Sequence, residues 1–212
     1  MSISLNPHAE IVWWLENHQV SNYKINENGI VDVAGSVDIS RLGLVSNLPF
    51  AFGIIDGDFL CNNNKFKSLV NMPKFVGGNF NCSSSLINTL EGCPIHIGGD
   101  FDCSYNKLTD LRFCIDQVGG SFNCRYNDIK SLEFGSSSVG GDYKCDGNQL
   151  TDLNFHPESV LGKFSCNFNK FENIAFEIMS SQEINLYYEN KRLNKDLLVG
   201  LVETPIFKGK KI

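Results

Sequence analysis

The chain has 212 residues, of which 42% are hydrophobic and 20% charged, with a formal net charge of -6 and an isoelectric point near 5.2. This composition is ordinary for a globular protein, and its acidic balance argues against a surface that coats nucleic acid, since such surfaces are strongly basic. No apolar run approaches the roughly 18 residues that cross a bilayer, and the N-terminal segment lacks the basic and apolar regions of a signal peptide. We therefore expect a cytoplasmic protein that binds neither nucleic acid nor a membrane.

The first 52 residues predict an N-terminal cap that begins with a helix. Asn6 and Pro7 form a helix start, because asparagine caps a first turn and proline fits its first position. The residues that follow give the helix one apolar face, which we expect to pack on the first coil: Ile11, Trp14, Leu15 and His18. Trp13 and Val12 lie beside this face, so a tryptophan stripe that binds a partner is the alternative.

A β-hairpin and an atypical first coil are predicted next. Apolar side chains alternate over residues 23–25 and 31–33, and Asn28-Gly29 between them suits a tight turn. Val37 and Ile39 continue the alternation. We expect these two residues to take the places that phenylalanine and cysteine occupy in the later coils.

Residues 53–174 consist of six copies of a 21-residue unit, a period typical of a solenoid. Aromatic residues recur at this period: Phe59, Phe80, Phe101, Phe122, Tyr143 and Phe164. Two positions after each stands a cysteine: Cys61, Cys82, Cys103, Cys124, Cys145 and Cys166. Disulfides do not tile a chain at one period, and no CxxC pair is present, so we expect reduced thiols packed in the core. Cys93 and Cys114 are also 21 residues apart.

Each unit predicts one short strand and one way of closing the coil. In F-x-C both side chains point inward, and parallel pairing with the next unit, about 4.8 Å away, aligns them into one core. Glycines precede the strand, where a Cβ would prevent close approach: Gly57, Gly78, Gly99, Gly120, Gly141 and Gly162. Asparagines follow it, where their amides can bond to backbone groups: Asn64, Asn106, Asn127, Asn148 and Asn169, with Ser85 in the second unit. A return ladder closes each coil: Ile55, Val76, Ile97, Val118, Val139 and Val160.

This unit resembles the leucine-rich repeat, whose core reads L-x-x-L-x-L-x-x-N-x-L. Phe101, Cys103, Asn106 and Leu108 match its last four marked positions, whereas Gly98 stands at the first one instead of leucine. The variant G-x-F-x-C-x-x-N-x-L-x-x-L is most similar to the short leucine-rich repeat proteins encoded by tailed bacteriophages and some bacteria. The resemblance implies an α+β/β solenoid, a right-handed stack with one parallel sheet, closed by caps at both ends.

The C-terminal cap is predicted over residues 175–212. Ile184 and Leu186 follow the last Phe and Cys by 20 residues and suggest a degenerate strand. The segment from Asn194 to Thr204 can form a short helix, and the final residues, FKGKKI, are basic.

Nothing in the sequence predicts catalysis, so we do not expect an enzyme, a cofactor or a metal. Nucleophile elbow, P-loop and dinucleotide motifs are absent from it. The four histidines lack ligand spacing with one another. A column of Cys93, Cys114 and His156, with His96 near Cys93, leaves a metal site or a small hydrolase as a distant alternative.

The outward face of the strands is the expected binding surface. Side chains that flank each Phe and Cys point to the concave side by the same alternation that buries those two. Tyrosine and arginine are frequent among residues that dominate interface energetics. Our candidate partner-binding residues are therefore Tyr105, Tyr126, Arg125, Asp102, Asp100, Lys144 and Phe168. The alternative is that the aromatic rings only cover the edges of the coils.

The favoured function is a non-enzymatic protein–protein interaction module that binds its partner across the concave sheet. The resemblance implies a phage protein that inhibits or redirects a host protein, such as one of the host's defences, in the host cytoplasm. A structural or assembly protein of a phage particle is the second hypothesis, and a small hydrolase or metal-binding protein is the third. The sequence does not indicate an oligomeric state.

Overall fold

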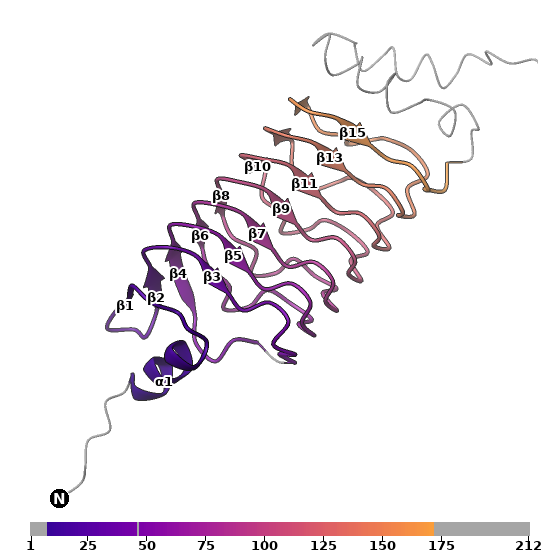
Figure 1. Ribbon diagram of the computed structural model, residues 1–212. Helices are drawn as coiled ribbons and strands as arrows, with labels where there is room; N and C mark the ends of the chain where they lie inside the picture. Colours follow the sequence, from indigo (N-terminus) through magenta and orange to yellow (C-terminus); the bar gives the residue numbers. More distant parts are fainter. Residues whose placement is uncertain (1–7, 46, 172–212) are drawn as a thin grey trace, which may run out of the picture.

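The computed structural model describes residues 8–45 and 47–171, which form a β-solenoid of about six turns preceded by one helix and a hairpin (Figure 1). Its main sheet has seven parallel two-residue strands, one from each coil. They are β3 (Val37–Asp38), β5 (Phe59–Leu60), β7 (Phe80–Asn81), β9 (Phe101–Asp102), β11 (Phe122–Asn123), β13 (Tyr143–Lys144) and β15 (Phe164–Ser165). Every strand pairs in register with its equivalent one unit away, Phe101 with Phe122 for example. The fold class predicted from the period is confirmed.

A second column of parallel strands corrects the expectation of a single sheet. It is formed by β2 (Val31–Val33), β4 (Phe52–Ile55), β6 (Phe75–Val76), β8 (His96–Ile97), β10 (Gln117–Val118), β12 (Ser138–Val139) and β14 (Ser159–Val160). The column is divided between β8 and β10, where Gly119 N–H still donates to Ile97 O at 3.2 Å. The buried return ladder supplies one residue to each strand from β4 onward. Since these residues are β-branched and repeat in register, the return segment itself pairs as strand.

The N-terminal cap agrees with the sequence at the hairpin and at the first coil. β1 (Tyr23–Ile25) pairs antiparallel with β2, and Gly29 at the turn has φ +74°. Val37 and Ile39 are buried, and Val37 pairs with Phe59, as expected for a first coil.

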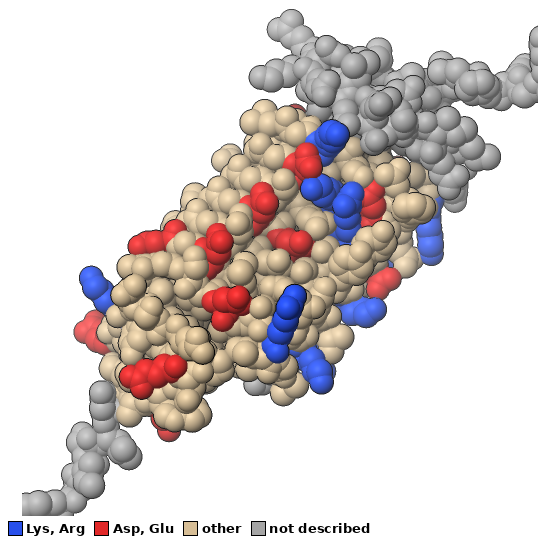
Figure 2. Space-filling model, in the orientation of Figure 1, with Lys and Arg blue, Asp and Glu red and all other residues tan. Residues whose placement is uncertain are grey.

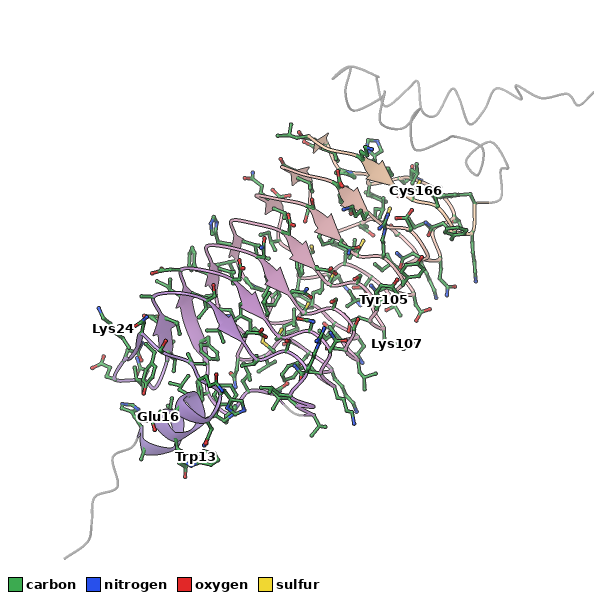
Figure 3. The ribbon with its side chains drawn as sticks, in the orientation of Figure 1. Trp13, Glu16, Lys24, Tyr105, Lys107 and Cys166 are labelled. Carbon is green, nitrogen blue, oxygen red and sulfur yellow. The ribbon has the colours of Figure 1, made fainter. Side chains whose placement is uncertain are left out.

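Helix α1 (Ala9–Asn17) follows the predicted apolar face. Its N-cap is His8, and the predicted start at Asn6 and Pro7 lies outside the described residues. Trp14 and Leu15 are buried, and the Trp14 ring lies 5.2 Å from that of Phe50. Trp13 is exposed (Figure 3). Packing therefore accounts for one tryptophan and not for the other.

The core is a continuous stack of rings and thiols. Ring centroids of successive coils lie between 5.0 and 6.1 Å apart from Phe59 to Phe164. All eight cysteines are free, and the six of the strand ladder are buried. No coil could bury this face alone, so contacts between neighbours supply most of the stability.

The asparagines bond neighbouring coils together as predicted. Asn127 Nδ2 donates to Cys103 O, Cys124 O and Arg125 O at 3.1–3.2 Å, and its Oδ1 accepts from Leu108 N–H at 3.0 Å. The amide thus bonds to the carbonyls of Cys124 and Arg125 in its own coil, and to the Cys103 carbonyl and the Leu108 N–H in the coil before it. Equivalent bonds recur at Asn64, Asn106, Asn148 and Asn169.

Paired glycines let the coils approach. A Cβ on Gly119 would lie 2.1 Å from Gly98 O, and one on Gly120 would lie 2.2 Å from Asp100 Oδ1. Real Cβ atoms do not come so close, so any other residue would push the coils apart. The glycine ladder is therefore required by close approach.

Part of the predicted organisation lies outside the described residues. This applies to residues 172–174 of the repeat region and to the whole predicted C-terminal cap, 175–212, with its strand at Ile184 and Leu186. Helix α1 spans 9 residues, and no helix within 8–45 and 47–171 is long and apolar enough to cross a membrane.

Candidate functional site

The residue before each strand serves the fold. The Oδ1 of Asp100 accepts the backbone N–H of Ser121, one coil on, at 2.6 Å, and Asp100 N–H in turn donates to Asn79 Oδ1 at 2.8 Å. The same bond recurs along the stack with a short acceptor side chain in each coil: Ser36, Asp58, Asn79, Asp100, Ser121 and Asp142. Asp100 therefore caps a backbone N–H of the next coil while its side chain stays exposed, and its contact with a partner remains a prediction.

Asp102 and Lys144 are also engaged within the protein. Asp102 Oδ1 accepts from the N–H and Oγ of Ser104 at 2.9 and 2.6 Å, and its Oδ2 accepts from Asn123 Nδ2 at 3.1 Å. Lys144 Nζ lies 3.0 Å from Asp142 Oδ2. Both side chains are half-buried, and each is bonded to a neighbouring side chain.

Arg125 is part of a partly buried network around the buried side chain of Asp146. Its Nε donates to Asp146 Oδ2, while the Oδ1 of Asp146 accepts from Ser165 Oγ and from the N–H and Nδ2 of Asn167. Burial by itself raises the pKa of Asp146, but the bonds from Ser165, Arg125 and Asn167 outweigh it, so the pKa lies below its usual value. The network joins three coils. Arg125 therefore bonds to Asp146 while its side chain stays 35% exposed, and its contact with a partner remains a prediction.

The aromatic candidates have the opposite character. The rings of Tyr105 and Tyr126 stack at 4.5 Å between centroids with 21° between their planes, as expected from their shared column. They are 55% and 44% exposed, and Phe168, two coils beyond Tyr126, is 81% exposed. The coil between Tyr126 and Phe168 has Gly147 at the equivalent position, where a Cβ would lie 2.6 Å from the Tyr126 ring. We call Tyr105, Tyr126 and Phe168 the tyrosine stripe.

The backbone conformation of the tyrosine stripe is unusual for aromatic residues. Tyr105, Tyr126 and Phe168 have φ of +54°, +52° and +57°, and the equivalent positions in other coils are Asn63, Ser84 and Gly147, also with positive φ. Glycine and asparagine adopt this conformation readily, whereas a bulky side chain there is an outlier that costs about 1–2 kcal/mol. The backbone at these positions favours asparagine or glycine, but the protein has aromatic residues at three of them.

A second column of exposed aromatic residues with positive φ was not predicted from the sequence. Leu111 O accepts from Cys114 N–H at 3.0 Å, and Phe113 between them has φ +69°, the third position of a type II turn. The same turn recurs in five coils and places Asn71, Gly92, Phe113, Phe134 and Phe155 at that position. The three phenylalanines are 64%, 57% and 58% exposed, and we call them the phenylalanine stripe. Their 21-residue spacing was visible in the sequence, but the left-handed backbone that prevents their burial was not.

The thiols are poor nucleophiles. Burial raises the pKa of all eight cysteines, to about 11 for Cys114 and about 12 for Cys166. The thiolate is the reactive and metal-binding form, so neutral thiols suit packing. Within residues 8–45 and 47–171, no group of three or more His, Cys, Asp or Glu side chains could hold a metal ion.

A hollow of about 460 Å³ lies beside the first strand of the main sheet. It is bordered by the end of α1 and by β3 and the residues after it: Asn17, His18, Gln19, Val20, Ser36, Val37, Asp38, Ser40 and Leu42. Its two titratable groups are already bonded, since His18 Nδ1 lies 2.7 Å from Trp14 O and Asp38 Oδ1 accepts from Ser40 N–H at 2.9 Å. The hollow has no arrangement of groups for acid–base chemistry.

Comparison of the chain with protein-family models, curated proteins and solved structures gave no match. The architecture is accordingly described as a β-solenoid with 21-residue repeats and stacked, buried Phe and Cys. The candidate site is therefore defined by its geometry. Its charged side chains form bonds within the protein, whereas its aromatic side chains are exposed.

Proposed function

We propose that this protein is a protein–protein interaction module and that the tyrosine stripe contacts the partner. The observation that supports this is the exposed, stacked Tyr105–Tyr126 pair, held at backbone positions that disfavour aromatic side chains. Strained residues that the fold does not need are concentrated at functional sites. Tyrosine on a rigid framework also loses little conformational entropy when it binds.

Charge next to the stripe indicates the character of the partner. Lys65, Lys107 and Lys130 are exposed on the segment that leaves the main sheet, and none of them has an ion-pair partner among the described side chains. Lys107 lies close to Tyr105 (Figure 3). Figure 2 shows carboxylates in line along the coils, with basic side chains gathered toward one side. A partner with aromatic or aliphatic groups bordered by carboxylates complements this surface.

The resemblance to short leucine-rich repeats carries the proposal one step further. The match at Phe101, Cys103, Asn106 and Leu108 is typical of such repeats in tailed phages and some bacteria, and the glycine at 98 departs from the general pattern. Under this proposal the partner is a bacterial host protein that the module inhibits or redirects. This step is an analogy at the level of the fold, which by itself does not determine function.

Capture from bacterial lysate tests the proposal. The double variant Tyr105→Asn/Tyr126→Asn removes both rings and keeps side chains that suit a positive φ, as Asn63 does in its own coil. We expect the affinity for the captured protein to fall at least tenfold, about 1.4 kcal/mol. Glu27→Ala, an exposed position in the turn of the N-terminal hairpin, is the control and should capture as the unmodified protein does. Equal capture by the double variant would exclude the tyrosine stripe as the contact surface.

A further inference from the structure

The phenylalanine stripe is unexplained by folding. Phe113, Phe134 and Phe155 occupy the third position of a type II turn, where two earlier coils carry Asn71 and Gly92. Each ring is more than half exposed, so its burial contributes little, while its left-handed backbone costs free energy. Three such rings in consecutive coils form an apolar row at a corner that the main sheet and the tyrosine stripe do not include.

Carboxylates surround this row. The turns that carry the three rings, residues 110–116, 131–137 and 152–158, hold five carboxylates and one guanidinium: Asp110, Asp116, Glu133, Asp152, Glu158 and Arg112. Arg112 is paired with Asp110, at 2.8 Å between Nη2 and Oδ2. Asp116, Glu133, Asp152 and Glu158 are exposed. An apolar row bordered by negative charge is complementary to a ligand that is apolar along one line and basic on both sides of it.

The spacing of the rings favours a helix as that ligand. Strands in register place equivalent residues about 4.8 Å apart, so the row from Phe113 to Phe155 extends over about 9.6 Å. In a helix, residues i and i+7 lie about 10.5 Å apart along the axis, with i+3 or i+4 between them on the same face. Three alternate residues of an extended strand would span about 13 Å. A helix therefore keeps one apolar side chain beside each ring, whereas a single extended strand does not.

We propose that the phenylalanine stripe docks a basic amphipathic helix of a partner protein. The apolar face of the helix packs on Phe113, Phe134 and Phe155, and its lysines and arginines lie against Glu133, Asp152 and Glu158. This surface is separate from the tyrosine stripe, so one molecule can hold two partners at once or contact a single partner at two places.

A model helix tests this with the full-length protein. The probe is a fluorescent 14-residue peptide with leucine at one helical face and lysine elsewhere, and its scrambled sequence of equal charge is the peptide control. Fluorescence anisotropy should show at least tenfold tighter binding of the amphipathic peptide than of the scrambled one. The triple variant Phe113→Asn/Phe134→Asn/Phe155→Asn should bind at least tenfold more weakly, and Tyr105→Asn/Tyr126→Asn should bind as the unmodified protein does.

Three outcomes would overturn the proposal. Equal affinity of the triple variant and the unmodified protein would show that the rings are not the contact. Equal affinity for the scrambled peptide would show that charge alone drives binding. If sedimentation shows a dimer that the triple variant converts to a monomer, a second copy of this chain covers the stripe, and a helical partner does not.

Discussion

Ser85 is the one exception in the asparagine ladder, and it shows what each amide contributes. Its Oγ accepts from Asn64 N–H at 3.3 Å and donates to Ser83 O at 3.5 Å, whereas Asn127 makes four bonds of 3.0–3.2 Å. A serine is too short to join the Cys carbonyls of two coils. The second unit is therefore the weakest joint of this ladder.

We predict that Ser85→Asn stabilises the protein. The new Nδ2 can donate to Cys61 O and Cys82 O, as Asn106 Nδ2 does to Cys82 O and Cys103 O at 3.1 Å. A net gain of about 1 kcal/mol is typical for such hydrogen bonds. Urea unfolding measures it, with Asn127→Ala as the opposite change, expected to cost about 1–3 kcal/mol. An unchanged midpoint in both variants would show that the ladder does not contribute to stability.

The lowered pKa of Asp146 predicts how the stability of the protein depends on pH. Its pKa in the folded protein lies below the usual 3.8, so the folded state favours the carboxylate more than the unfolded state does. The contribution is complete above about pH 4 and is lost as the pH falls through the lower, folded-state pKa. Asp110 and Asp142 have lowered pKa values as well, because of the Arg112 side chain and the Lys163 N–H respectively, and act in the same range.

Asp146→Asn should therefore have a smaller loss of stability between pH 5 and pH 3 than the unmodified protein. The change removes the titrating group while keeping an oxygen that can accept from Ser165 and Asn167. Thermal unfolding across this range provides the measurement. Parallel stability curves for the two proteins would mean that Asp146 is not the group involved.

At the same scale, the candidate site shows how far residue-by-residue reading reaches. Alternation correctly placed the side chains of Asp100 and Arg125 on the outward face, and the shared column of Tyr105 and Tyr126 predicted their contact. The alternation along a strand predicts which way a side chain points, but it does not predict the hydrogen bonds that the side chain makes. The bonds from Asp100 to Ser121 and from Arg125 to Asp146 depend on the exact offset between coils, which only coordinates provide.

At the scale of elements, the period predicted the strands of the main sheet and their register. The return ladder was expected to close each coil, but its strands were not predicted, because a single β-branched residue such as Val118 within glycine-rich sequence carries no alternation of its own. Pairing arises there from the stack: once the main sheet fixes the coil spacing, the return segments lie at hydrogen-bonding distance. The phenylalanine stripe was missed for a related reason, since a periodic Phe after a Leu resembles a core position until its turn is known.

For the whole molecule, the two stripes and the core divide the aromatic residues by role. Rings on the strands of the main sheet stack inside, and rings at the two left-handed columns stand outside on different corners of the same coils. A solenoid whose stability comes from neighbouring coils can carry substitutions at such corners without losing its core. Recognition and folding would then rest on separate sets of residues.

The most direct test of this division is the urea midpoint of Phe113→Asn/Phe134→Asn/Phe155→Asn beside that of Phe122→Ala. Phe122 is fully buried between two coils, and its truncation should cost about 3–5 kcal/mol. The triple variant should unfold within about 0.5 kcal/mol per site of the unmodified protein, or above it, because asparagine relieves the left-handed backbone. A loss in the triple variant comparable to three core deletions would contradict the account, since the exposed rings would then belong to the fold.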